Sequence, residues 1–311
     1  MMSDASFLTV AAPAKVNLFL HLTGRTADGY HTLESLFVFV HVTDQIALQR
    51  STSFDFQVTG PFADLLDSDA EDNLVMRAAR LLAAEAGATA GRSPVHAAAA
   101  PAHTAAGARM VLTKRLPPAA GIGGGSSDAA ATLLGLARLW NLAIAPERLA
   151  TLALELGADV PACLHRAPQW VAGIGERCTP APQPRFRALV LVNPGVLVPT
   201  AAVFKRFAAD GRGFSDPIDI WPTAPDRIDR DWLVGRTRND LEPVAIALAP
   251  QIASVLDTLR DLDGVQLARM SGSGATCFAA FDTLEAAEAA AERLRTDRPD
   301  WWVEAGHILT D

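Results

Sequence analysis

The stretch Leu116-Pro-Pro-Ala-Ala-Gly-Ile-Gly-Gly-Gly-Ser-Ser-Asp-Ala-Ala130 places four glycines directly before two serines and an aspartate. Glycine has no Cβ, so its backbone N–H can turn toward a ligand, and the first N–H groups of a helix lack partners within that helix. The positive end of the helix dipole adds to this, so such a loop suits a nucleotide phosphate. A plain glycine turn before a helix is the alternative. The amphipathic continuation through Leu133, Leu136, Ala137 and Trp140 favours the phosphate site.

Other phosphate loops are excluded by inspection. A Walker loop ends in Gly-Lys-Ser or Gly-Lys-Thr, whereas no lysine follows a glycine in this chain. A dinucleotide fingerprint requires a third glycine at position 126, where a serine stands. The His-Arg-Asp and Asp-Phe-Gly signatures of protein kinases are missing as well. The loop therefore belongs to a different class.

Composition narrows the function further. With 311 residues, of which 50% are hydrophobic and 20% charged, the chain has the make-up of a globular enzyme. Its formal charge of −8 argues against a nucleic-acid binder. The N-terminus lacks a secretory pattern, and the longest uncharged stretch, 188–204, contains Pro194 and Pro199 and does not read as a membrane span. We therefore expect no membrane contact. A monomer or weak homodimer is the expected assembly, although composition does not determine it.

The number and spacing of the cysteines indicate the redox state of the compartment in which the protein works. Cys163, Cys178 and Cys277 are odd in number and far apart, which fits a reducing cytoplasm and neither a disulfide framework nor a metal site. Lysine use is equally informative, because only three of the 27 basic residues are lysines. Two of them, Lys15 and Lys114, lie in suggestive places, and a lysine kept against an arginine background indicates a need for a compact ammonium group.

Hydrophobic patterning predicts an α+β chain, because strands and helices alternate without regular βαβ spacing. Lys15 and Asn17 fall on one face of the first strand. Asp159 stands in a sharp turn, Gly157-Ala-Asp-Val-Pro161, exposed at a helix end. A proline-rich stretch at 180–184 predicts a boundary between domains 1–180 and 181–311. We expect strands at 7–22, 33–42, 110–114, 188–193 and 276–281, and one or two more within 46–58. We expect helices at 74–86, 146–156, 243–262, 284–294 and after Ser127, and an alanine-rich exposed loop over most of 87–108.

Three segments together resemble the motifs of the GHMP small-molecule kinases, in order and in spacing. They are Pro-Ala-Lys-Val-Asn at 13–17, the glycine loop, and Ser-Gly-Ser-Gly-Ala-Thr-Cys-Phe-Ala-Ala-Phe at 271–281. Segments 14–20, 25–33, 71–74 and 157–161 are similar to those members that phosphorylate a cytidine-diphosphate-linked methylerythritol. The resemblance runs from about residue 10 to about residue 308, and is weakest at 87–108 and 208–235.

The resemblance implies a two-domain GHMP-kinase fold with an N-terminal ATP-binding α/β domain and a C-terminal ferredoxin-like α/β domain. It implies transfer of a phosphoryl group from ATP, with Mg²⁺, to the 2-hydroxyl of the methylerythritol unit, a step of the non-mevalonate isoprenoid pathway. It assigns catalytic roles to Lys15 and Asp159. Asp159 would accept the hydroxyl proton, and Lys15 would keep that carboxylate ionised and stabilise developing negative charge. A surface pair without a catalytic role is the alternative.

The resemblance also assigns binding residues. Tyr30, the only tyrosine, would stack on the cytosine while His31 bonds its polar edge, with Phe204 as a second aromatic and Asn17 at the sugar alcohol. Taken alone, a Tyr-His pair is more often ordinary strand packing. The ATP site would comprise Asn73, Lys114, Pro117, Gly121, Gly123, Gly124, Gly125, Ser126 and Ser127, with Ser127 as a Mg²⁺ ligand through ATP.

Two features leave alternatives open. Pro118 and Ala119 occupy loop positions where the family usually has another residue followed by glycine, so nucleotide affinity could differ. A homoserine-type or mevalonate-type GHMP kinase would not require the Asp-Gly-Tyr-His segment at 28–31. A non-catalytic nucleotide-binding regulator on the same fold is a further alternative, against which the presence of both Lys15 and Asp159 argues.

Overall fold

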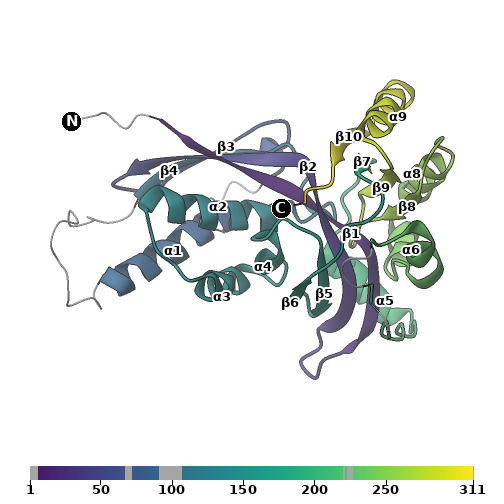
Figure 1. The fold of residues 1–311 in the computed structure, drawn as a ribbon, viewed down its shortest axis with the longest axis horizontal. Helices are drawn as coiled ribbons and strands as arrows, with labels where there is room; N and C mark the ends of the chain where they lie inside the picture. Colours follow the sequence, from purple (N-terminus) through teal and green to yellow (C-terminus); the bar gives the residue numbers. More distant parts are fainter. Residues whose placement is uncertain (1–5, 67–71, 91–106, 220, 223–226, 311) are drawn as a thin grey trace. The chain divides into compact units, whose positions relative to one another are not determined.

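The computed structural model describes residues 6–66, 72–90, 107–219, 221–222 and 227–310 (Figure 1). The start of the chain, Glu71 of the Asp-Asn-Leu motif and most of the alanine-rich stretch lie outside the described residues. The two ends of that stretch are regular, since 87–90 continue a helix and 107–108 begin a strand. The loop predicted for most of the stretch stays a prediction.

The chain forms two compact units, each made of several segments. The first unit comprises Met1–Ala12, Thr43–Pro118 and Gly125–Leu164, and the second comprises Pro13–Val42, Ala119–Gly124 and His165–Asp311. Two long strands, β1 (Leu8–Arg25) and β2 (His31–Ser51), contribute residues to both units. The predicted domain boundary near residue 180 stays a prediction.

Strand β2 is longer than the sequence pattern indicated. The sequence predicted a break between 42 and 46, but the strand is continuous because Val42, Asp44 and Ile46 alternate as buried residues on one face. Asp44 can occupy that face because it is paired with Lys114. A buried charge with a partner thus replaces the apolar residue that the pattern required.

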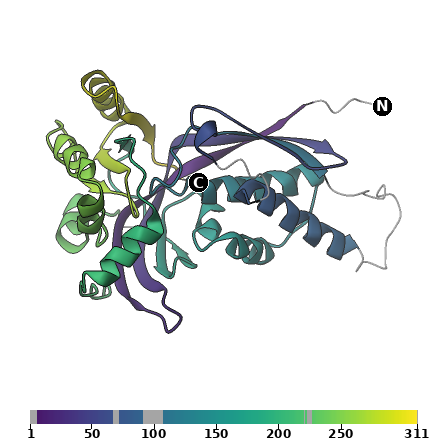
Figure 2. The ribbon, with the colours of Figure 1, turned by 180° about the vertical axis from the view of Figure 1, so that it is seen from behind.

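The first unit combines a small sheet with four helices. Strand β4 (Gly107–Thr113) pairs antiparallel with β2, with Gln45 opposite Thr113, and parallel with β3 (Asp55–Thr59). In Figures 1 and 2 the helices lie together on one side of β3 and β4. The helices are α1 (Leu74–Ala90), α2 (Gly124–Trp140), α3 (Pro146–Leu156) and α4 (Val160–Cys163), and a short 3₁₀ turn covers Ala63–Leu65.

The second unit contains the beginning of β2 and a separate four-stranded sheet. Strand β5 (Gln169–Gly173) pairs antiparallel with β2 and with β6 (Arg177–Pro180). The other sheet has the order β10-β7-β9-β8 and is antiparallel throughout. The strands of this sheet are β7 (Ala188–Asn193), β8 (Leu267–Met270), β9 (Cys277–Phe281) and β10 (Trp302–His307). The described helices of this unit are α5 (Thr200–Ala209), α6 (Arg230–Arg236), α7 (Glu242–Leu248), α8 (Gln251–Arg260) and α9 (Leu284–Asp297).

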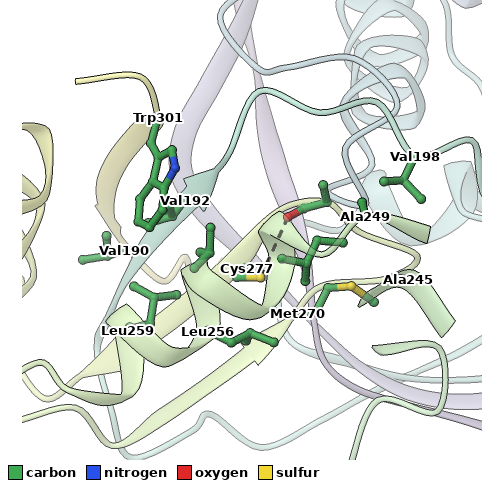
Figure 3. Close-up of a cluster of buried hydrophobic side chains, with 14 of the residues drawn as sticks. Val190, Val192, Val198, Ala245, Ala249, Leu256, Leu259, Met270, Cys277 and Trp301 are labelled. Atoms are coloured by element: carbon green, nitrogen blue, oxygen red, sulfur yellow. Dashed lines mark hydrogen bonds between the residues drawn. The ribbon is translucent and has the colours of Figure 1, made fainter. Parts of the chain in front are cut away.

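Apolar side chains from this sheet and its helices form one core. Figure 3 shows Val190 and Val192 of β7 beside Leu256 and Leu259 of α8, with Cys277 of β9 in the same cluster. All six residues of β7 are buried, as is typical of a central strand covered on both faces. The α+β prediction is confirmed by this mixture of helices and largely antiparallel sheets.

One predicted helix is in fact two. The sequence indicated a single helix over 243–262, but α7 ends at Leu248 and α8 begins at Gln251. Pro250 separates them, because proline lacks the N–H that would continue the helix and disfavours the helical conformation of the preceding residue. Ala249 accordingly has φ −140° and ψ 87°. Within the described ranges, no helix is long and apolar enough to cross a bilayer.

Candidate active site

Lys15 and Asn17 form a buried polar pair on β1. The Lys15 Nζ donates to Asn17 Oδ1 at 2.9 Å and lies 4.2 Å from the centroid of the Phe37 ring. The Asn17 Nδ2 donates to Ser35 Oγ at 2.9 Å. The prediction that Lys15 and Asn17 share one face of the strand is confirmed by this contact. Because both side chains are nearly enclosed, the ammonium group is held in one orientation.

The tip of the glycine loop lies against Lys15. The Lys15 backbone N–H donates to Ile122 O at 2.9 Å. Gly123 has φ 61°, and a Cβ there would lie 2.8 Å from Lys15 Cε. Gly121 has φ 76°, and a Cβ there would lie 2.3 Å from Ser271 O. These two glycines are therefore required by close approach of the neighbouring chain as well as by backbone conformation.

The third motif completes the cluster. Ser271 Oγ accepts from the Asn17 N–H at 3.0 Å and donates to Gly121 O at 2.9 Å. Asn239 Nδ2 donates to the Met270 and Gly272 carbonyls, at 2.8 Å each, and so holds the Ser-Gly-Ser-Gly turn. The three motifs thus converge within the second unit. Sequence reasoning missed the roles of Ser35, Ser271 and Asn239, although the polar run Thr237–Asp240 before α7 was a usable signal for Asn239.

Of the residues expected at the cytosine, His31 and Phe204 lie together in a small aromatic group, and Tyr30 is not part of that group. The His31 ring lies 5.3 Å from that of Phe204 and 5.9 Å from that of Phe207. Tyr30 is 61% exposed, in a turn closed by the Thr26 N–H donating to Tyr30 O at 2.8 Å. Burial, and to a smaller extent Arg25, lowers the pKa of His31. The imidazole is therefore neutral near pH 7, with one nitrogen able to donate and one able to accept.

In the first unit, the predicted phosphate end of the loop opens helix α2. The helix begins at Gly124, before the predicted start after Ser127, because the left-handed conformations end at Gly123. The first N–H groups of α2 accordingly belong to Gly124, Gly125, Ser126 and Ser127, the groups that have no acceptor within the helix. This arrangement suits an anion.

The remaining predicted residues of this unit have distinct settings. Asn73 Oδ1 accepts from the Val75 N–H at 2.9 Å and so caps α1. Asp159 is half-buried and directly precedes α4. Pro117 is buried. Ser127 is 1% exposed, and its hydroxyl donates to Cys163 Sγ at 3.5 Å, so as placed it is not open to a cation.

Lys114 is buried, whereas the sequence indicated a position at the entry to the ATP site. Its Nζ donates to Asp44 Oδ2 at 2.5 Å and to Asp128 Oδ2 at 2.7 Å. Burial opposes the charge of Lys114, but the attraction of both carboxylates outweighs it and raises the pKa. Burial raises the pKa of Asp128 to about 7, against the opposing effect of Lys114. Sequence reasoning missed Asp44 and Asp128, because an isolated aspartate carries no pairing signal.

Two family models match the chain. The model of the GHMP kinases N terminal domain covers residues 73–167, and that of the GHMP kinases C terminal domain covers residues 230–299. With the three motifs gathered as described, the fold and the site define a GHMP kinase, a class that uses ATP as co-substrate.

Individual relatives show to which family of GHMP kinases the chain belongs. A 4-diphosphocytidyl-2-C-methyl-D-erythritol kinase of Cereibacter sphaeroides is 47% identical over 96% of this chain and 98% of its own length. The kinase of the same name from Rhizobium etli is 43% identical over 99% of this chain and 97% of its own length. A crystal structure of 4-(cytidine 5'-diphospho)-2C-methyl-D-erythritol kinase matches with a TM-score of 0.74 and 32% identity, over 98% of this chain and 100% of that one. The chain belongs to this kinase family.

Homoserine kinase from Cytophaga hutchinsonii shares the fold. Its crystal structure matches with a TM-score of 0.65 at 19% identity, over 100% of this chain and 96% of that one. At this identity the likeness concerns the fold alone. The choice among acceptors must therefore come from the side chains of the site.

Proposed function

We propose that the protein transfers the γ-phosphoryl group of ATP to the 2-hydroxyl of 4-diphosphocytidyl-2-C-methyl-D-erythritol, in the non-mevalonate route to isoprenoid precursors. The contact of His31 with Phe204 is the observation that carries this proposal. A neutral imidazole beside an aromatic ring offers a pyrimidine both an edge to bond and a face to stack on. Homoserine and mevalonate have no base that would use such a group.

Each part of the acceptor has a proposed partner in the second unit. Tyr30 and Phe204 stack on the cytosine, and His31 bonds its polar edge. Asn17 contacts the sugar alcohol, and its amide is already oriented by Lys15 and Ser35. An amide whose orientation is set before binding loses little entropy when the acceptor arrives.

The chemistry needs a base and a compensating charge. As the 2-hydroxyl oxygen forms its bond to the γ-phosphorus, its proton passes to the Asp159 carboxylate. The bond from the γ-phosphorus to the oxygen bridging to the β-phosphate breaks, and ADP leaves with those electrons. Lys15 stabilises the negative charge that develops on the transferring group. The rigid mounting of its ammonium group supports this role, because a preoriented charge pays no reorganisation cost during reaction.

ATP would be bound by the glycine loop and by the first N–H groups of α2, with Asn73 and the Lys114–Pro117 segment beside the base. We propose that Mg²⁺ arrives with the ATP phosphates, which is its usual mode in such sites. The described residues contain no cluster of three or more metal-ligating side chains. The buried Ser127 hydroxyl does not fit a direct ligand as placed, and no step is derived through the metal.

A coupled assay of ADP release tests this function. The purified enzyme is offered the cytidine substrate, homoserine and mevalonate in parallel, each with ATP and Mg²⁺. We expect turnover with the first acceptor only. Turnover with homoserine or mevalonate instead would identify another GHMP kinase, and ATP binding without turnover of any acceptor would identify a regulator.

We further propose that the enzyme works in a reducing cytoplasm as a monomer or weak homodimer. The absence of any disulfide among Cys163, Cys178 and Cys277, all of which lie in described segments, supports the reducing compartment. Sedimentation velocity at micromolar and millimolar concentrations of the enzyme would measure the oligomeric state.

A further inference from the structure

Lys114, Asp44 and Asp128 form a buried charged triad in the first unit. The side chains are 2%, 0% and 4% exposed, and the Lys114 ammonium group lies between the two carboxylates. The carboxylates belong to elements far apart in sequence, since Asp44 lies on β2 and Asp128 lies in the second turn of α2. Lys114 directly follows β4. The triad therefore ties three elements together.

Asp44 also holds the backbone that follows Lys114. Its Oδ1 accepts from the N–H groups of Arg115 and Leu116, at 2.5 and 2.8 Å. These residues form the entering stem of the glycine loop, and Asp128 lies in the leaving stem. The ion pair between Lys114 and Asp128 thus joins the two stems, 14 residues apart along the chain.

The triad is not explained by stability alone. Lys114 and Asp44 would already form a balanced buried pair, so Asp128 adds a second buried carboxyl group that this pair does not need for charge balance. Asp128 Oδ1 is buried and has no hydrogen-bond partner among the described residues. A buried polar atom without a partner costs stability. The arrangement therefore requires a benefit other than stability.

Preorganisation of the loop supplies that benefit. Glycine loses more conformational entropy on ordering than any other residue, and this loop contains four. If the stems were loose, phosphate binding would have to order them and would be weaker by that cost. We infer that Asp44, Lys114 and Asp128 are positioning residues that clamp the stems of the glycine loop, so that the loop meets the ATP phosphates already ordered. In this role the Lys114 ammonium group acts by holding the two stems together, and not by contact with the phosphates.

Substitutions at Asp128 test the clamp. Asp128→Ala cuts the link to α2 and leaves the balanced pair of Lys114 and Asp44, so the chain should fold. Asp128→Asn keeps an oxygen that can accept from Lys114 but removes the ion pair. Calorimetry with a non-hydrolysable ATP analogue and Mg²⁺ should show binding weakened about tenfold by Asp128→Ala and about threefold by Asp128→Asn. In steady state the KM for ATP should rise, while the KM for the phosphoryl acceptor stays within about twofold.

Thr132→Ala is the matched control. Thr132 is fully buried one turn later on α2, and its hydroxyl donates to the Asp128 backbone carbonyl at 2.8 Å, outside the triad. This variant should bind the analogue as the parent does, even if it unfolds at a lower temperature. Analogue binding by folded Asp128→Ala equal to that of the parent, or an equal loss in Thr132→Ala, would overturn the clamp. If Asp128→Ala does not fold, Asp128→Asn is titrated with the analogue instead, and binding equal to that of the parent would overturn the clamp.

The inference rests on the proposed function only for the use of ATP. Analogue binding is measured without any acceptor, so it reports on the clamp whichever alcohol is phosphorylated. Failure of the parent enzyme to turn over the cytidine substrate would contradict the proposed function and leave this result standing.

Discussion

The Lys15 side chain passes so close to Gly123 that a Cβ at position 123 would lie 2.8 Å from Lys15 Cε. The backbone of Lys15 is tied to the same loop through its bond to Ile122. A glycine of the phosphate loop therefore also makes room for the proposed catalytic lysine. Loop conformation and the position of the ammonium group are coupled by this single contact.

Gly123→Ala should accordingly displace Lys15 and lower kcat by roughly 10- to 100-fold, the effect of moving a reacting group by about an ångström. Gly211→Ala is the matched control, because Gly211 has φ 62° with open space around it while Gly123 has φ 61°. Both substitutions place a Cβ at a similar positive φ and so impose similar backbone strain, about 1 kcal/mol. Equal kcat values for the two variants would show that the contact with Lys15 has no catalytic consequence.

Asp159→Asn preserves shape and removes the proposed base, so turnover should fall by roughly 10²–10⁴-fold. ATP binding, measured by calorimetry, should change little. Lys15→Met should cause a similar loss. In the proposed transfer both groups serve the same step, so the double variant should lose far less than the product of the two losses. Turnover of Asp159→Asn within a few-fold of the parent would exclude Asp159 as the base.

Tyr30→Ala should weaken binding of the cytidine substrate by about 1–3 kcal/mol, the range for stacking of a base on an aromatic ring. His31→Ala should reduce discrimination between the cytidine and uridine forms of the substrate, because loss of an edge contact affects the correct base more than the wrong one. Titration of each variant with both substrates and with ATP measures these effects. An equal loss for ATP and substrate would refute the cytosine assignment.

Ala119→Gly should stabilise the protein by about 1 kcal/mol, because Ala119 has φ 50°, a left-handed conformation that disfavours a Cβ. Urea denaturation measures the gain. Asn141→Gly is the comparison, since Asn141 has φ 56° but asparagine tolerates this region better, so its gain should be smaller. A lower free energy of unfolding for Ala119→Gly than for the parent would contradict the claim that Ala119 is strained.

Stability should fall as the pH drops below 6.5 because of His21. Burial lowers the pKa of His21 from 6.5, opposed by Asp240 and assisted by Arg238 and Arg269. At pH values between the pKa of His21 in the folded protein and 6.5, the unfolded chain binds more protons than the folded protein does. The contribution of His21 to stability is therefore complete above pH 6.5 and is lost as the pH falls. Its Nε2 accepts from the Arg238 N–H at 3.2 Å, and Nδ1 is buried without a partner in the described structure.

His21→Gln retains an acceptor for Arg238 and cannot be protonated. Its free energy of unfolding should therefore change less between pH 7.5 and about pH 5.5 than that of the parent. Urea denaturation of both proteins at the two pH values makes the comparison. Identical pH dependence in parent and variant would show that His21 does not contribute.

Local pattern alone was enough for much of this protein. The run of glycines before Ser126 located the loop, and the apolar spacing of Leu133, Leu136 and Trp140 located the helix behind it, because glycine conformation and helical periodicity are properties of neighbouring residues. The spacing of two between Lys15 and Asn17 correctly placed them on one face of a strand. The motifs themselves were sufficient to identify the class of kinase.

Tertiary structure decided what depends on residues distant in sequence. The sequence predicted that the strand would break before residue 46, and only the pairing of Asp44 with Lys114 shows why β2 continues through this position as a buried strand. The contact between His31 and Phe204, and the approach of Lys15 to Gly123, are set by how strands and loops pack. Whether a charge is buried, and what neutralises it, follows from three-dimensional neighbours, because the cost of desolvation is recovered only by partners that the fold brings together.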